Sequence, residues 1–159
     1  MNKSGPSSAS GSPRQVLVVE DLAYEMRPLL EWIQDRGYEI VLVETEREAA
    51  ESIRAVAAGR ESYRLMLVDV MLAAMPLDDL QLITEEEACQ LPDPAEAGAR
   101  LVKLAREDLH ISSTTLPIVV MTYRSVDVGL KNRFPSRTQI YSKTDDEGLR
   151  RYLEVYLPV

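Results

Sequence analysis

Five polar residues at the ends of short apolar runs are the candidates for chemistry in this sequence. Glu20 and Asp21 follow the run QVLVV, and Asp69 lies near the far end of RLMLVDVML. Thr122 closes the run IVVMT, and Lys143 follows QIYS. A carboxylate in so apolar a segment has to be paired, solvated at an edge or bound to a metal ion. Its oxygen is also a competent nucleophile toward a phosphoryl group when cations neutralise the transferred oxygens.

The segments that carry these residues have the pattern of an α/β protein. Aliphatic runs alternate with amphipathic segments, as expected for a doubly wound, five-stranded parallel sheet with helices on both faces. We expect strands over residues 15–20, 38–44, 63–70, 116–122 and 139–142. We expect helices over 24–37 and 94–108, and two more that open at the capping boxes Thr45/Glu48 and Thr144/Glu147.

This architecture brings the polar residues together. With right-handed crossovers, the carboxyl ends of parallel strands share one edge of the sheet. Three carboxylates, a hydroxyl and an amine therefore converge there. Three neighbouring acids cannot all remain ionised without a cation, because each raises the pKa of the others. Mg²⁺, which binds a few carboxylates together with phosphate oxygens and waters, satisfies this requirement.

Composition limits the class of protein. The 159 residues suffice for one domain, and the formal charge of -8 without a dense basic run argues against direct nucleic-acid binding. No apolar segment is long enough to span a membrane, and the N-terminus MNKSGPSSASGSPR lacks the core of a signal peptide. We therefore expect a cytoplasmic protein with a disordered tail over residues 1–14 and one domain over 15–159.

The chain resembles the receiver domain of two-component response regulators, the chemotaxis-protein type of flavodoxin-like fold. The likeness runs from about Gln15 to Leu157 and depends on VLVVED, LMLVDV, IVVMT and YSK, in this order and each at a strand end. It implies the strand order 2-1-3-4-5. It also implies that Asp69 is the phosphoacceptor, that Asp21 binds Mg²⁺ directly and Glu20 through water, and that the backbone carbonyl of Met71 completes the metal site.

The resemblance also assigns the remaining polar residues. Thr122 would hydrogen-bond the phosphoryl group, and Lys143 would pair with its charge. Three positions depart from the family pattern, the first being Thr144, which follows Lys143 where the family usually has proline. Tyr123 stands where the family usually has a small residue, so we expect it to modulate access to the phosphoryl pocket. Ile140 occupies the usual aromatic position, while Tyr141 should face the other side of its strand.

The function that we expect is that of a stand-alone receiver, because the chain ends one residue after YLP. It would accept a phosphoryl group on Asp69 from a sensor histidine kinase or phosphotransfer protein and signal by contact with a downstream effector protein. It would act on no separate substrate as an enzyme. The alternative is a pseudo-receiver, a phosphorylation-independent interaction module. A third class is a Mg²⁺-dependent phosphohydrolase with an aspartyl nucleophile, although no second acid next to Asp69 is evident as its general base.

An acidic insertion over residues 72–97 is the largest departure from the family. It contains no basic residue, and its seven acids are Asp78, Asp79, Glu85, Glu86, Glu87, Asp93 and Glu96. Two readings are open: a solvated, disordered loop, or a segment that binds a partner. Thr84 and Glu87 have the spacing of a capping box, which favours a short helix within the insertion.

Overall fold

The computed structural model describes residues 13–159, which form a five-stranded, all-parallel sheet in the order β2-β1-β3-β4-β5. The strands are β1 (Gln15–Val19), β2 (Glu39–Val43), β3 (Leu65–Asp69), β4 (Ile118–Thr122) and β5 (Gln139–Ser142). The predicted doubly wound sheet and its strand order are thus confirmed. Residues 1–12 of the predicted tail lie outside the described residues.

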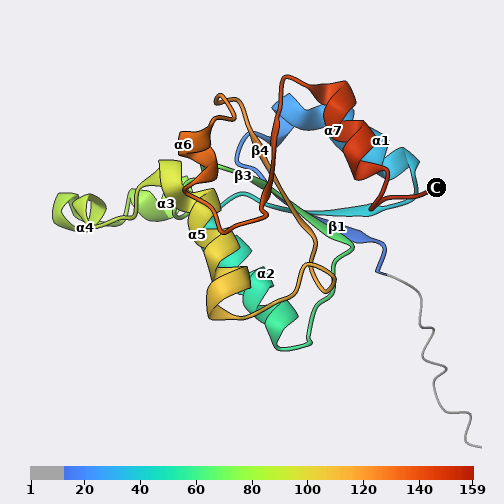
Figure 1. The fold of residues 1–159 in the computed structure, drawn as a ribbon. Helices are drawn as coiled ribbons and strands as arrows, with labels where there is room; N and C mark the ends of the chain where they lie inside the picture. The colour runs from blue at the N-terminus through green and yellow to red at the C-terminus, as the bar shows by residue number, and fades with distance from the viewer. Residues whose placement is uncertain (1–12) are drawn as a thin grey trace, which may run out of the picture.

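Helices cover both faces of the sheet (Figure 1). One face carries α1 (Arg27–Asp35), preceded by the 3₁₀ turn η1 (Ala23–Met26), and α7 (Asp146–Leu153). The other carries α2 (Glu46–Ala57) and α5 (Ala97–Lys103), which continues as the π turn η3 (Leu104–Asp108). Side chains of β3 alternate between the two cores, with Leu65 and Leu67 in one and Met66 and Val68 in the other. Burial on both faces explains why the strand sequences are continuously apolar.

Local sequence sets where the helices begin. Pro28 lies in the first turn of α1, where its missing N–H leaves no hydrogen bond unmade. Thr45 caps α2 by accepting a hydrogen bond from the N–H of Glu48. The predicted cap of the last helix is wrong: Asp145, not Thr144, accepts from the N–H of Gly148. The hydroxyl of Thr144 instead hydrogen-bonds that of Ser142 at 2.6 Å.

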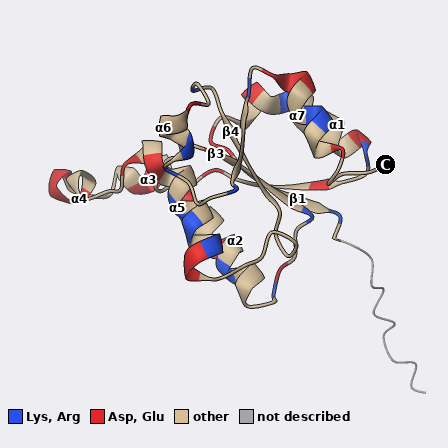
Figure 2. Cartoon of the chain, in the orientation of Figure 1, with Lys and Arg blue, Asp and Glu red and all other residues tan. Residues whose placement is uncertain are grey.

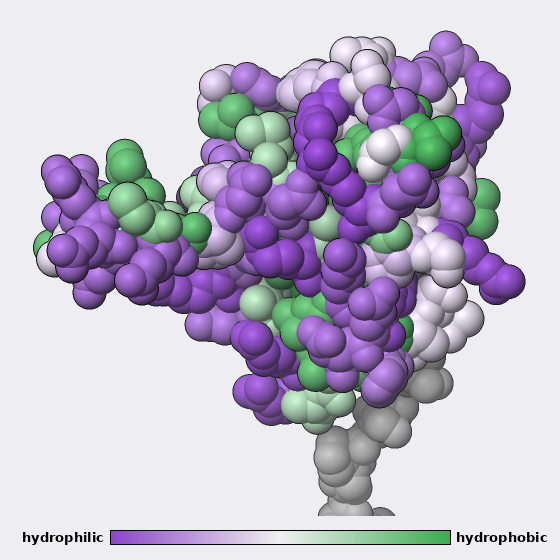
Figure 3. All heavy atoms as spheres, turned by 60° about the vertical axis from the view of Figure 1, so that its left-hand side comes forward, coloured by the Kyte–Doolittle hydropathy of each residue, from purple (hydrophilic) through white to green (hydrophobic). Residues whose placement is uncertain are grey.

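The acidic insertion, residues 72–97, forms an arm that projects from the body (Figures 1 and 3). It contains α3 (Leu77–Leu80), α4 (Glu85–Cys89) and the 3₁₀ turn η2 (Pro94–Glu96). The predicted capping box of Thr84 and Glu87 is present at the start of α4. Acidic residues gather on α3 and α4 (Figure 2). The insertion therefore has secondary structure of its own.

Three arginines outside the arm bind residues of the arm. Arg47 pairs with Asp79 at 3.3 Å, and Arg133 pairs with Glu96. Arg100 donates to both carboxylate oxygens of Glu46 and to the backbone carbonyl of Asp93 at 2.8 Å.

Between β4 and β5 the chain forms only the one-turn helix α6 (Val128–Lys131). None of the helices within residues 13–159 is both long and apolar enough to cross a bilayer.

Candidate functional site

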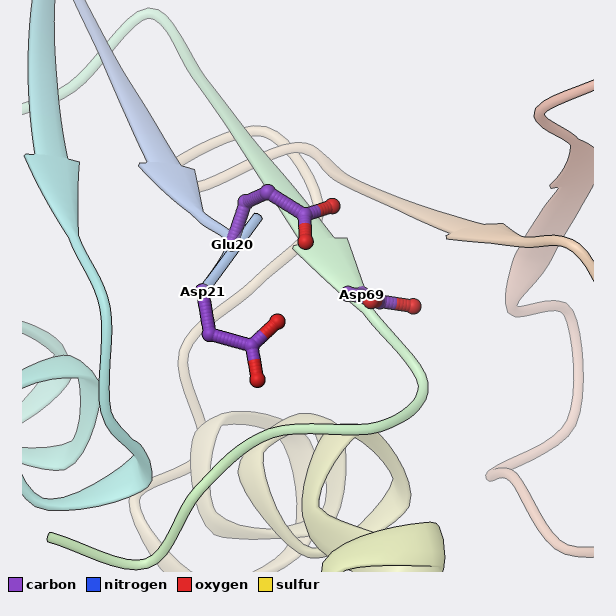
Figure 4. A group of neighbouring side chains, drawn as sticks. All are labelled: Glu20, Asp21 and Asp69. Carbon is purple, nitrogen blue, oxygen red and sulfur yellow. The ribbon is translucent and has the colours of Figure 1, made fainter. Parts of the chain in front are cut away.

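Three carboxylates meet at the carboxyl edge of the sheet (Figure 4). Glu20 and Asp21 follow β1 directly, and Asp69 is the last residue of β3, the neighbouring strand. One carboxylate oxygen of each lies within 4.8 Å of the others. Glu20 is fully buried and Asp69 is 9% exposed, whereas Asp21 is exposed at the rim. The parallel register thus brings together the three acids that the sequence analysis selected.

The side chain of Lys143 reaches into this cluster from the end of β5. Its ammonium donates to Oε2 of Glu20 and, at 3.1 Å, to Oδ2 of Asp69. The lysine side chain is only 5% exposed. A buried cation between two buried carboxylates offsets much of their repulsion and of the penalty for removing all three from water.

Thr122 lies one position beyond the residue that pairs with Asp69 on the adjacent strand, since Asp69 is in register with Met121. It is 2% exposed, and its hydroxyl accepts a hydrogen bond from the N–H of Arg124 at 2.9 Å. Its backbone carbonyl accepts from the N–H of Lys143 at 2.8 Å. The threonine and the lysine are therefore fixed to each other through the backbone.

Burial and like charge raise the pKa values of Asp69 and Asp21. Desolvation, followed by the charge of Glu20, raises the pKa of Asp69 to about 6, although Lys143 opposes the shift. The same two causes raise the pKa of Asp21. Burial alone would lower the pKa of Lys143, but its hydrogen bond to Glu20 and the charge of Asp69 outweigh burial and raise it. Burial and the charge of Glu20 thus oppose ionisation of Asp69, whereas Lys143 is held in its charged form.

The donor set fits a hard divalent cation. All three side-chain ligands are carboxylates, which Mg²⁺ prefers, and one lysine faces three acids there. The N–H of Met71 donates to Oδ1 of Asp69 at 3.4 Å, so the chain turns back beside the carboxylate after β3. Use of the Met71 carbonyl as a further ligand stays a prediction.

Tyr123 lies beside the acid cluster, whereas Ile140 and Tyr141 lie on opposite faces of the sheet. The ring of Tyr123 lies against Lys143, with Nζ 4.8 Å from the ring centroid, and the residue is 55% exposed. Ile140 packs into the core under α2 and α5. Tyr141 faces the opposite core and stacks on Tyr152 at a centroid distance of 4.6 Å. Opposite faces for Ile140 and Tyr141 were predicted.

Gly98, in the first turn of α5, is a site residue that the sequence analysis missed. A Cβ atom there would lie 2.5 Å from the carbonyl oxygen of Asp69 and 2.9 Å from Cα of Val70. Its N–H donates to the carbonyl of Val70 at 3.0 Å. The helix thus packs directly on the backbone of Asp69, and only glycine permits that approach. The available signal was its position, at the point where the helical pattern resumes after the insertion.

No protein-family model matches the sequence, and a search of curated proteins found no significant match. Solved structures do resemble the chain. The receiver domain of a sensor histidine kinase from Pseudomonas aeruginosa PAO1, with magnesium in its active-site cleft, is 19% identical, with 93% of this chain and 100% of that chain covered and a TM-score of 0.56.

Two further structures agree with it. A response regulator receiver protein from Sinorhizobium medicae is 16% identical, with 91% and 94% covered and a TM-score of 0.61. The response regulator TrrA of Thermotoga maritima, in complex with Mg²⁺ and BeF, is 20% identical, with 91% and 99% covered and a TM-score of 0.55. With its strand order and the acids at its sheet edge, the chain has the fold of response regulator receiver domains.

Proposed function

We propose that this protein is a response regulator receiver that accepts a phosphoryl group on Asp69 from a histidine kinase or phosphotransfer protein. The single observation that carries the proposal is the bridge of Lys143 between Glu20 and Asp69 at the edge where Asp21 and Thr122 also lie. An oxygen of Asp69 attacks the phosphorus of the donor's phosphohistidine. A P–O bond forms, the P–N bond breaks, and the imidazole leaves with its electron pair.

Each side chain has a role in this transfer. Lys143 lies where its ammonium meets the charge on the transferred oxygens. The hydroxyl of Thr122 donates to the phosphoryl group while its oxygen accepts from the N–H of Arg124, so the loop after β4 is linked to the modification. Glu20, Asp21, Asp69 and the Met71 carbonyl would hold Mg²⁺, which, when bound, neutralises charge on the phosphoryl oxygens.

This proposal accounts for more of the geometry than its alternatives do. A pseudo-receiver would need neither a buried nucleophile nor a lysine bonded to it. A phosphohydrolase would need a second acid beside Asp69 as general base, and within the described chain both neighbouring acids belong to the cluster that fits the cation. We expect turnover to be limited to hydrolysis of the protein's own aspartyl phosphate.

The experiment is phosphorylation by a small acyl phosphate. Acetyl phosphate with Mg²⁺ should add one phosphoryl group, seen by intact-protein mass spectrometry, with acetate as leaving group. Asp69→Asn should abolish the addition, whereas Asp127→Asn, which alters an exposed acid that caps α6, should not. Hydroxylamine should remove the group, since it cleaves acyl phosphates. A wild-type protein that gains no phosphate, or an Asp69→Asn variant that still gains it, would overturn the proposal.

A further inference from the structure

Lys143 lies between two sets of acids. The inner acids, Glu20 and Asp69, hold its ammonium in the structure. The outer acids, Glu25 and Asp146, line a cavity of about 270 Å³ that Lys143 also lines, and Asp146 pairs with Arg150 at 2.9 Å. Lysine has a flexible stem of four carbons, so it can change partners by rotation about its side-chain bonds. A further contact that favours the inner position would keep the ammonium away from the outer acids.

Tyr123 is the side chain placed to do this. It lines the same cavity as the outer acids, and its ring lies face-on to the ammonium at 4.8 Å from the centroid. The rest of the cavity wall is apolar: Met26, Pro28, Leu29 and Leu149. The ring is thus the one aromatic surface there, and it offers the ammonium an attraction that aliphatic walls lack.

The hydroxyl of Tyr123 has no part in this contact, because the contact is between the ammonium and the ring. More than half of the tyrosine is exposed, whereas the lysine beside it is 5% exposed. The ring therefore covers the lysine on one side and faces solvent with the other. Phenylalanine would keep both the attraction and the cover, and leucine would lose the attraction while retaining an apolar side chain.

We propose that Tyr123 is a positioning residue, whose ring holds the Lys143 ammonium against the inner acids and away from the outer acids. A phosphoryl group delivered to Asp69 then meets the lysine already in place, which is the arrangement that favours transfer. The role rests on the proposed function of Asp69. It differs from that of a lid, because a lid slows phosphorylation and a positioning residue speeds it.

The first test observes the contact without any phosphorylation. The protein has four lysines, Lys3, Lys103, Lys131 and Lys143, so an NMR spectrum of protein labelled at the lysine ε-carbons is simple to assign with Lys143→Arg. Protons above the face of an aromatic ring are shifted upfield. The Lys143 ε-protons should show this shift in the wild type and in Tyr123→Phe, and should lose it in Tyr123→Leu.

The second test measures the initial rate of phosphorylation by acetyl phosphate at saturating Mg²⁺. Tyr123→Phe should match the wild type, and Tyr123→Leu should be slower by about two- to fivefold, the range of a cation–π contact at a partly exposed site. Adding Glu25→Gln to Tyr123→Leu should recover part of the loss, because one competing acid is gone.

The outcomes separate this proposal from the one that it rests on. A Tyr123→Leu variant that is phosphorylated as fast as the wild type, or faster, overturns positioning and leaves the phosphoacceptor role intact. An upfield shift that is absent from the wild type also overturns it. If the wild type takes up no phosphate while the shift depends on the ring as expected, the contact stands and the phosphoacceptor role fails.

Discussion

Oδ2 of Asp69 lies 3.1 Å from Nζ of Lys143, across 74 positions of sequence. The contact exists because β3 and β5 flank β4 and end at the same edge of the sheet. The contact joins Asp69, the proposed nucleophile, to the ammonium of Lys143, which would stabilise the phosphorylated aspartate. We expect the stability of the metal-free protein to depend on the same lysine, since Glu20 shares it.

Lys143→Met tests that dependence. Methionine keeps an unbranched apolar stem and removes the charge, so two buried carboxylates lose their shared counterion. We expect the free energy of unfolding in EDTA to fall by about 3 kcal/mol. Urea denaturation would measure it, with the exposed Lys131→Met as control. Mg²⁺ should restore part of the loss. Equal urea midpoints for the two variants would show that the lysine contributes no net stability.

The raised pKa of Asp69 leads to a second prediction, which concerns the metal-free protein. Because the folded pKa is about 6 and the unfolded value about 3.9, the folded state binds more protons between these values. Stability from this group is therefore present below about pH 4 and is lost as the pH rises through 6. Asp69→Asn should be more stable than the wild type at pH 7.5, by about 1–3 kcal/mol, and the advantage should vanish near pH 4. Urea unfolding across this pH range would measure the difference in stability between the two proteins. An extra stability of Asp69→Asn that does not change with pH would contradict the raised pKa of Asp69.

Magnesium affinity tests the carboxylate cluster itself. Asp21→Asn and Asp69→Asn each remove a charged ligand, so each should weaken Mg²⁺ binding at least tenfold, about 1.4 kcal/mol, by isothermal titration calorimetry. Glu51→Gln, on the exposed side of α2, removes the same charge elsewhere and should leave the affinity unchanged. If all three variants bind Mg²⁺ alike, the ion does not bind at this cluster.

The sequence sufficed for the architecture of the site but not for its side-chain contacts. Continuous apolar runs predict a sheet buried on both faces, and strand ends then converge by topology alone. This logic placed Asp21, Asp69 and Thr122 correctly at one edge. It could not predict that Lys143 would bond Glu20 as well as Asp69, because the choice depends on rotamers and on burial from both sides.

Two residues show contacts that the local sequence pattern did not predict. The spacing of Thr144 and Glu147 satisfies a capping box, yet Asp145 provides the cap because the turn after β5 directs its side chain to the N–H of Gly148. The sequence around Gly98 gives no sign of its role, because the atoms that require a glycine there belong to the backbone of Asp69, 29 positions earlier in the sequence. The constraint on Gly98 thus depends on how segments distant in the sequence approach each other.

Gly98→Ala tests the close packing of α5 on the backbone of Asp69. The added methyl group would lie 2.5 Å from a backbone oxygen, which can move only with the strand that ends in Asp69. We expect a loss of about 1–3 kcal/mol in unfolding free energy, together with slower phosphorylation. Gly129→Ala in α6 is the matched control, because its methyl group would meet only a side-chain oxygen of Asp127 at 3.3 Å. Wild-type stability for Gly98→Ala would mean that α5 can shift away from β3 without penalty.

The acidic arm provides the last prediction, because it begins three residues after Asp69 and contains seven acidic residues and no basic one. Such charge should repel a small anionic phosphate donor over roughly 10 Å at moderate ionic strength. A short Gly-Ser linker in place of residues 74–95 removes six of the seven acids. It leaves Leu72 and the buried residues of α5 in the core, so the sheet should fold. Acetyl phosphate should then phosphorylate the shortened protein faster at low salt, with the advantage fading as salt rises. Thermal unfolding and circular dichroism would check the fold. A folded, shortened protein whose phosphorylation rate shows no salt-dependent gain would exclude electrostatic gating, because only the charge of the arm makes the effect depend on salt.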